Sequence, residues 1–79
     1  MKEATVAETV RAILAYLREN PDAQDTQAGI VQWWLNDLPV KPRGATVKQA
    51  LDNLVRDGFL SAHKGKDAQI SYRMKIPPP

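Results

Sequence analysis

Residues 46–60 read TVKQALDNLVRDGFL, and this stretch decides the fold of the 79-residue chain. Its apolar residues recur at helical spacing, which predicts a helix with one buried stripe over about 46–57. The stripe consists of Val47, Leu51, Leu54 and Val55, with Ala50 at its edge. Gly58 stands where a left-handed residue would close the helix, and Leu60 then begins a strand. The first prediction is therefore a helix that passes through one glycine into a strand.

The start and the outer face of this helix follow from the same residues. Thr46 and Gln49 have the spacing of a capping box, which predicts that the helix begins at Thr46. The side chains expected to point away from the stripe are Gln49, Asp52, Asn53 and Arg56, with Lys48 beside them. The helix should thus expose a face of amides and charges.

Upstream, residues 5–19 predict another amphipathic helix. Thr5 and Glu8 form a capping box at its start, and the Asn20-Pro21 pair ends it because proline disfavours helical backbone in the preceding residue. Its expected buried stripe is Val6, Val10, Ile13, Leu14 and Leu17.

Between these two segments a second helix is expected to begin with Asp25 or Thr26 as N-cap and to stop before Pro39. Its inward face should hold Ile30, Val31, Trp34, Leu35 and Leu38. Trp33 lies outside that arc, so it is either covered by another element or partly exposed. Gly29 is costly inside a helix, and a close contact with a neighbouring helix would explain it. The proline- and glycine-rich segment 39–44 should then form a turn of about six residues.

Downstream, alternating apolar residues predict a two-stranded β-hairpin around a turn at 64–67. The apolar residues of both strands face one side only if an odd number of loop residues separates them, and a turn centred on Lys66 meets that condition. This register pairs Ala62 with Ile70 and Leu60 with Tyr72, and it leaves His63, Gln69, Ser71 and Arg73 on the other face. The three prolines at 77–79 should be a flexible end.

The order helix, helix, turn, helix, hairpin resembles the winged helix-turn-helix family over about residues 5–76. Residues 46–60 resemble its recognition helix and first wing strand, although the turn before them is longer than the three or four residues of the tight form. The resemblance implies an α+β fold: a three-helix winged helix-turn-helix with a C-terminal two-stranded β-hairpin wing, in one domain spanning 1–79. It also implies a small transcriptional regulator of the bacterial type that binds double-stranded DNA.

In such a domain the third helix would enter the major groove, and the wing would hold the phosphate backbone. The residues expected to bind DNA are Lys41, Arg43, Thr46, Lys48, Gln49, Asn53, Arg56, Lys64, Lys66 and Arg73. Glutamine and asparagine suit adenine, and lysine and arginine suit guanine or phosphate. The plainer interpretations are that helix 46–57 only exposes a solvated face and that the lysines protect a hairpin edge from aggregation.

Composition limits the remaining function classes. The chain has no cysteine and one histidine, so it offers no thiolate zinc site, and we expect neither a cofactor nor enzymatic activity nor a small-molecule substrate. No apolar run approaches the length of a membrane span and no signal-like segment begins the chain, so we expect a cytoplasmic protein without a membrane partner. The net charge of +2 divides into −3 for residues 1–40 and +5 for residues 41–79, which places the basic excess on the predicted recognition helix and wing.

One alternative function stays open at this point. The winged-helix fold also serves as a protein-protein interaction module, and the basic half is diluted by acids. Tyr16 and Trp33, which both flank their stripes, could form an aromatic patch for a protein partner or for a second copy of the chain. Single-stranded nucleic acid is less favoured, because the basic half has few aromatic residues for stacking on bases.

Overall fold

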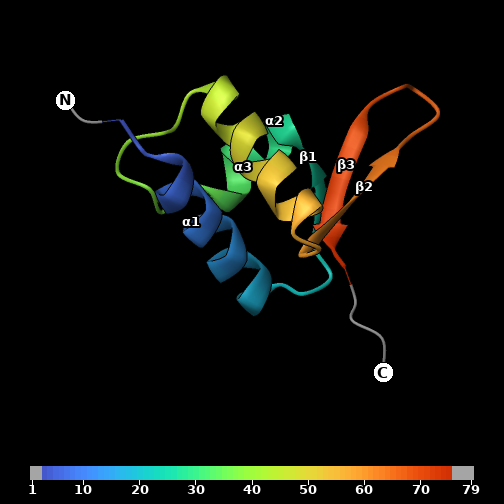
Figure 1. Cartoon of the computed structure of the whole chain (residues 1–79), viewed down its shortest axis with the longest axis horizontal. Helices are drawn as coiled ribbons and strands as arrows, with labels where there is room; N and C mark the ends of the chain where they lie inside the picture. The colour runs from blue at the N-terminus through green and yellow to red at the C-terminus, as the bar shows by residue number, and fades with distance from the viewer. Residues whose placement is uncertain (1–2, 76–79) are drawn as a thin grey trace.

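A computed structural model describes residues 3–75 of the chain (Figure 1), so the predicted flexible end at 77–79 lies outside the described residues. The fold is α+β, with three helices and a three-stranded antiparallel sheet. The elements in chain order are α1 (Val6–Glu19), β1 (Gln24–Thr26), α2 (Gln27–Gly29) continuing into the π-helical η1 (Ile30–Trp34), α3 (Gly44–Arg56), β2 (Leu60–Lys64) and β3 (Ile70–Met74).

The predicted capping box at the start of α1 is confirmed. Thr5 Oγ1 accepts a hydrogen bond from the Glu8 amide at 3.1 Å, and the Thr5 amide donates to Glu8 Oε1 at 3.0 Å. The helix ends at Glu19, where the amide of Asn20 donates to the Tyr16 carbonyl at 2.9 Å. Both ends of α1 therefore follow from its own sequence.

The second helix starts as predicted but ends earlier. Thr26 is its N-cap, and Thr26 Oγ1 accepts from the Gly29 amide at 3.3 Å. The segment Ile30–Trp34 then widens into a π-turn, closed by the Leu35 amide on the Ile30 carbonyl at 3.1 Å. The predicted helix reaches Leu38, just before Pro39, whereas the observed one ends at Trp34 because a turn follows the π-turn directly. The connection to α3 therefore spans residues 35–43, and it is longer than the predicted turn of six residues.

The close neighbour of Gly29 is not the neighbouring helix that the sequence predicted. A Cβ atom at this position would overlap the carboxylate of Asp25, which lies over the start of the second helix. That carboxylate is held there because Asp25 Oδ1 accepts a hydrogen bond from the Thr26 amide at 2.8 Å. The close neighbour of Gly29 is thus a side chain of β1, which would have to move to admit a larger residue.

The end of α3 follows the prediction, whereas its start does not. Gly58 has a φ of +85°, and the Phe59 amide donates to the Leu54 carbonyl at 2.9 Å, which closes the helix as a Schellman motif. The predicted capping box at Thr46 is wrong. The helix already begins at Gly44, since the Arg43 carbonyl accepts from the Val47 amide at 3.0 Å, and Thr46 lies within the first turn.

The sheet has one strand more than predicted. Its order is β1-β3-β2, with β3 in the centre, so the predicted two-stranded wing is one part of a three-stranded sheet. β1 pairs Gln24 with Arg73 and Thr26 with Ser71. Its three residues are polar and show no apolar alternation, so only the pairing with the distant β3 defines β1 as a strand.

The hairpin register differs from the prediction by two residues. Leu60 pairs with Met74 and Ala62 with Tyr72, so the turn is centred on Asp67 and not on Lys66. The shift arises in the loop 66–68, where the Gly65 amide donates to the Gln69 carbonyl at 2.8 Å. An even shift preserves the faces, and Leu60 and Tyr72 are buried on the core side as expected.

Ala68 closes this loop with a φ of 67°, the left-handed region that favours glycine. We therefore predict that Ala68→Gly raises the free energy of unfolding by about 0.5–1 kcal/mol, because it relieves a strained backbone. Urea denaturation followed by tryptophan fluorescence measures the change. Ala45→Gly, in the first turn of α3, is the control and should destabilise the protein; a loss of stability in both variants would contradict the loop geometry.

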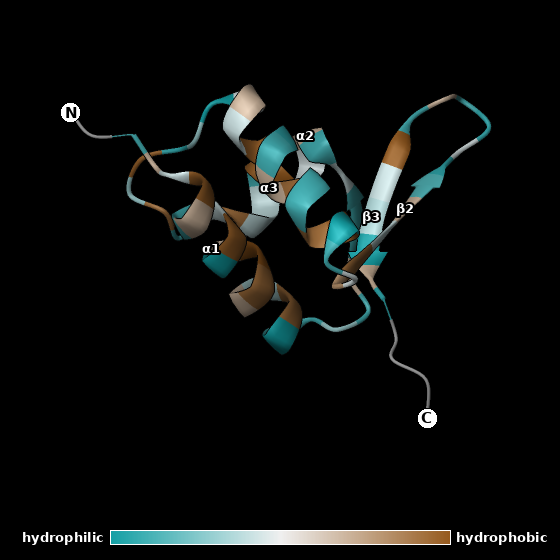
Figure 2. Ribbon diagram, viewed as in Figure 1, coloured by the Kyte–Doolittle hydropathy of each residue, from teal (hydrophilic) through white to brown (hydrophobic). Residues whose placement is uncertain are grey.

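The core lies between the helices and the inner face of the sheet. Its buried hydrophobic side chains are Ile13, Leu17, Ile30, Trp34, Leu35, Val47, Ala50, Leu51, Leu54, Leu60 and Tyr72. Figure 2 shows hydrophilic residues along the outward side of α3 and hydrophobic ones where α1 and α3 meet. Within residues 3–75 no helix is long and apolar enough to cross a membrane.

Candidate nucleic-acid interface

The outward face of α3 carries the side chains predicted to contact bases. Lys48, Gln49, Asp52 and Arg56 are exposed and Asn53 is half-buried. They occupy this face because the buried stripe of Val47, Ala50, Leu51 and Leu54 fixes the rotation of the helix against the core. The predicted division of α3 into a buried and an exposed face is confirmed.

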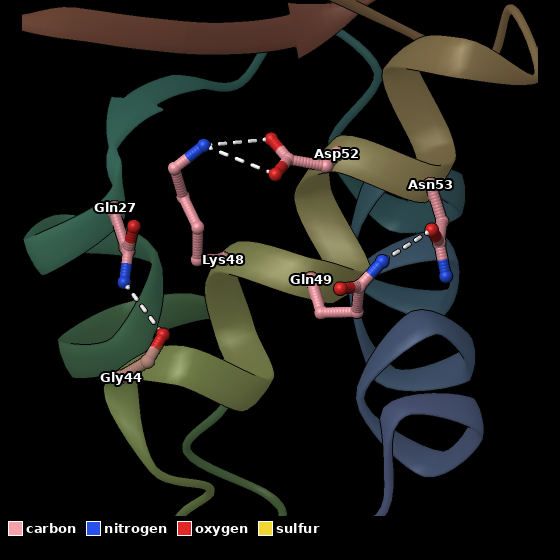
Figure 3. Close-up of polar contacts among 6 residues, drawn as sticks. All are labelled: Gln27, Gly44, Lys48, Gln49, Asp52 and Asn53. Carbon is pink, nitrogen blue, oxygen red and sulfur yellow. Dashed lines mark hydrogen bonds and ion pairs between the residues drawn. The ribbon is translucent and has the colours of Figure 1, made fainter.

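An ion pair joins two residues on this face. Lys48 Nζ lies 2.8 Å from Asp52 Oδ1 and 3.1 Å from Oδ2, one helical turn apart (Figure 3). The hydrogen bond to Asp52, together with the charge of that carboxylate, raises the pKa of Lys48 above its ordinary value. Lys48 therefore stays charged. The negative charge of Asp52 offsets it, however, so the pair attracts a distant phosphate only weakly.

A second contact joins the two amides of the face. Gln49 Nε2 donates to Asn53 Oδ1 at 2.8 Å (Figure 3). Because this pair also spans one helical turn, both pairs run along α3 at a spacing of four residues. The amide pair lies beside the ion pair and adds no net charge.

Two further predicted cations are paired with acids. Arg43 Nε lies 2.8 Å from Glu3 Oε1, and Arg56 Nε lies 3.3 Å from Asp57 Oδ1. All these side chains are at least half exposed, so each pair contributes little to stability and can exchange partners readily. The cations around α3 are thus available to phosphates only in competition with acids of the same chain.

Lys41 has a structural contact. Its Nζ donates to the Val31 carbonyl at 3.1 Å and to Asn36 Oδ1 at 3.4 Å, near the end of the second helix. Thr46 is half-buried in the first turn of α3. Lys41 lies outside α3, whereas Thr46 precedes Gln49 by three residues and Asn53 by seven, at the start of the same helix face.

Among the cations predicted to bind DNA, the two lysines of the hairpin have the fewest contacts. Lys64 and Lys66 are exposed near its tip, and within residues 3–75 neither forms an ion pair or a side-chain hydrogen bond. Arg73 lies on the face of the sheet turned away from the core, where its Nε donates to His63 Nε2 at 3.1 Å.

The predicted residues border three separate hollows. Lys48 lines a groove of about 340 Å³ between the second helix and the hairpin, together with Ile70. Asn53 and Arg56 line another of about 550 Å³, between α3 and α1. Arg73 borders a third, of about 330 Å³, beside β1. The expected basic residues thus surround α3 and the hairpin but do not line one cleft.

Three contributors to these surfaces were not predicted from the sequence. Gln27 Nε2 donates to the Gly44 carbonyl at 3.0 Å and so ties the second helix to the start of α3 (Figure 3). Phe59 and Ile70 are 52% and 45% exposed, although alternation predicts that Ile70 faces the core. Periodicity assigns a side chain to a face, but it does not show where an element extends past the core.

The two aromatic residues of the alternative partner surface have different surroundings. Tyr16 is half-buried and stacks on Trp34, with ring centroids 5.1 Å apart and planes at 9°. Trp33 is 57% exposed.

Within the described part of the chain no group of three histidine, aspartate or glutamate side chains could hold a metal ion. Comparisons of the chain with models of known families, with curated proteins and with solved structures gave no match.

Proposed function

We propose that this protein is a winged helix-turn-helix domain that binds duplex DNA through α3 and the β2–β3 hairpin, and that it acts in transcription regulation. The observation that carries the proposal is a polar α3 face that no other described element covers, next to a hairpin that projects past the helices (Figure 1). An exposed helix of this kind fits the major groove, and a cationic hairpin beside it fits the adjacent backbone.

Charge supports the same surface. Residues 60–75 contain four lysine or arginine side chains against one carboxylate, and within residues 3–75 neither Lys64 nor Lys66 forms an ion pair that DNA would have to displace. Around α3, the ion pairs of Lys48 and Arg56 are exposed and exchange easily. The hairpin would therefore supply most of the attraction to phosphate, and α3 would add contacts of shorter range.

Fluorescence anisotropy with a labelled duplex of about 20 base pairs, over a series of salt concentrations, tests the proposal. We expect binding at about 50 mM salt and a linear fall of log K with log salt, because each phosphate contact releases a counterion. Absence of binding at 50 mM salt would rule out the proposal. Binding of equal strength to a single strand would rule out recognition of duplex DNA.

The ion pair on α3 leads to a specific prediction. Asp52→Asn removes the acid beside Lys48, so we expect about threefold to tenfold tighter DNA binding at low salt and a smaller gain at high salt. Anisotropy titrations at two salt concentrations measure this. Asp37→Asn, at an exposed site after the second helix, removes the same charge elsewhere. Equal gains in both variants would show that net charge, and not the α3 face, is responsible.

A second candidate function is favoured by one observation, the 57% exposure of Trp33. An exposed tryptophan is a common anchor in protein interfaces. If the domain is a protein-interaction module, Trp33→Ala should abolish capture of a specific partner and leave DNA binding unchanged. If α3 and the hairpin bind DNA, Lys64→Ala should weaken DNA binding. The two variants measured side by side distinguish the two functions.

A further inference from the structure

The hydrogen-bonded pair of Gln49 and Asn53 has a chemical property that neither residue has alone. Each free amide side chain could present its own donor and its own acceptor to a base. Here Gln49 Nε2 donates to Asn53 Oδ1 at 2.8 Å, so one donor and one acceptor face each other within the pair (Figure 3). The pair must therefore meet a ligand as one unit.

The hydrogen bond leaves both donors and acceptors free. The Gln49 Oε1 atom accepts, the two hydrogens of Asn53 Nδ2 and the second hydrogen of Gln49 Nε2 donate, and Asn53 Oδ1 keeps a second lone pair. If both amides were turned over, the remaining groups would be Asn53 Oδ1 as acceptor and Gln49 Nε2 as donor. In either orientation the pair offers an acceptor and a donor from adjacent side chains.

Only one base presents the complementary pattern in the major groove. Adenine shows a donor at N6 beside an acceptor at N7, whereas guanine shows two acceptors, thymine one acceptor and a methyl group, and cytosine one donor. Guanine is disfavoured further by Asp52, whose carboxylate lies on the same face of α3 and would repel two acceptor atoms. The two cations on this face that otherwise suit guanine are also engaged, Lys48 with Asp52 and Arg56 with Asp57.

We propose that Gln49 and Asn53 together recognise a single adenine in the major groove, so that the DNA sites of this protein contain an A·T pair at that position. The inference rests on the proposed binding of duplex DNA by α3, and it adds the class of base that α3 selects.

The experiment begins with selection of bound duplexes from a random library, followed by anisotropy titrations on the selected sequence. We expect an A·T pair to be enriched at one or more positions. Its replacement by G·C should weaken binding by the wild-type protein about fivefold to hundredfold. Substitution of 7-deazaadenine, which lacks the N7 acceptor, should also weaken binding and thereby locate the contact in the major groove.

Variants of the pair test whether it acts as a unit. Gln49→Ala and Asn53→Ala should each abolish discrimination between A·T and G·C, and the double variant should lose no more than either single one. Gln32→Ala, at an exposed amide on the second helix, is the matched control and should keep full discrimination. Circular dichroism confirms that each variant is folded.

The outcomes separate the inference from the proposed function. If no duplex binds, both are wrong. If duplexes bind without preference for A·T, or if the preference persists in Gln49→Ala, the adenine inference is overturned while DNA binding stands.

Discussion

Replacement of Leu51 by alanine is expected to lower the free energy of unfolding by about 2–5 kcal/mol. Leu51 is fully buried near the centre of α3 and belongs to the hydrophobic core. A domain of this size has only about 4–12 kcal/mol of stability in total, so the variant should be partly unfolded at moderate temperature. The expected fall in melting temperature is about 10–30 °C.

Urea denaturation followed by the fluorescence of the buried Trp34 measures this loss. Val55→Ala is the control, because Val55 is half-buried on the edge of the same stripe and should cost about 1 kcal/mol. A cost below 1 kcal/mol for Leu51→Ala would mean that α3 does not pack on the core through this residue.

Removal of the two hairpin lysines is expected to have the largest effect on DNA affinity. Lys64→Ala and Lys66→Ala should each reduce the slope of log K against log salt by about one, and the double variant should bind about tenfold or more weakly at low salt. The reason is that, within residues 3–75, neither lysine is neutralised by an acid, unlike Lys48 and Arg56. Anisotropy titrations over a range of salt concentrations provide both quantities.

Arg18→Ala serves as the control for charge alone. Arg18 is an exposed cation in the last turn of α1, in the acidic half of the chain. Its removal should alter the salt slope by less than half as much as removal of either lysine. An equal change would mean that the protein attracts DNA through its overall charge and not through the hairpin.

The parts of the fold that could be predicted are those determined by neighbouring residues. Three such features are the capping box at Thr5, the glycine that ends α3 at position 58 and the buried stripe of α3. Each depends on residues within about one or two helical turns. The side of the sheet on which Leu60 and Tyr72 lie was also predictable, because side chains alternate between the two faces along each strand.

The errors have causes beyond local sequence. β1 consists of three polar residues and is a strand only because β3, 47 residues further on, pairs with it. The hairpin register depends on loop geometry, including an alanine at positive φ at position 68. At Thr46 a capping box was present in the sequence, yet the helix begins earlier, after the buried Pro42. Local motifs therefore indicate the type of element better than its limits.

The sequence indicated which residues form the candidate site, but it indicated less well which of them contact one another. Spacing placed Gln49 and Asn53 on the outer face of α3, and it could also have shown that Lys48 and Asp52 lie one turn apart. The pairing of Arg43 with Glu3 joins residues 40 positions apart, which no local pattern indicates. The structure thus changes the expected site from a row of free cations to a paired helix face beside a cationic hairpin.

The most direct test of DNA binding through α3 and the hairpin is an NMR titration of the ¹⁵N-labelled protein with a short duplex at about 50 mM salt. Amide shifts should change over residues 46–57 and 62–71, and they should change little over the α1 residues that border Tyr16. Shift changes centred on Trp33 or on α1, with α3 and the hairpin unaffected, would contradict the proposal.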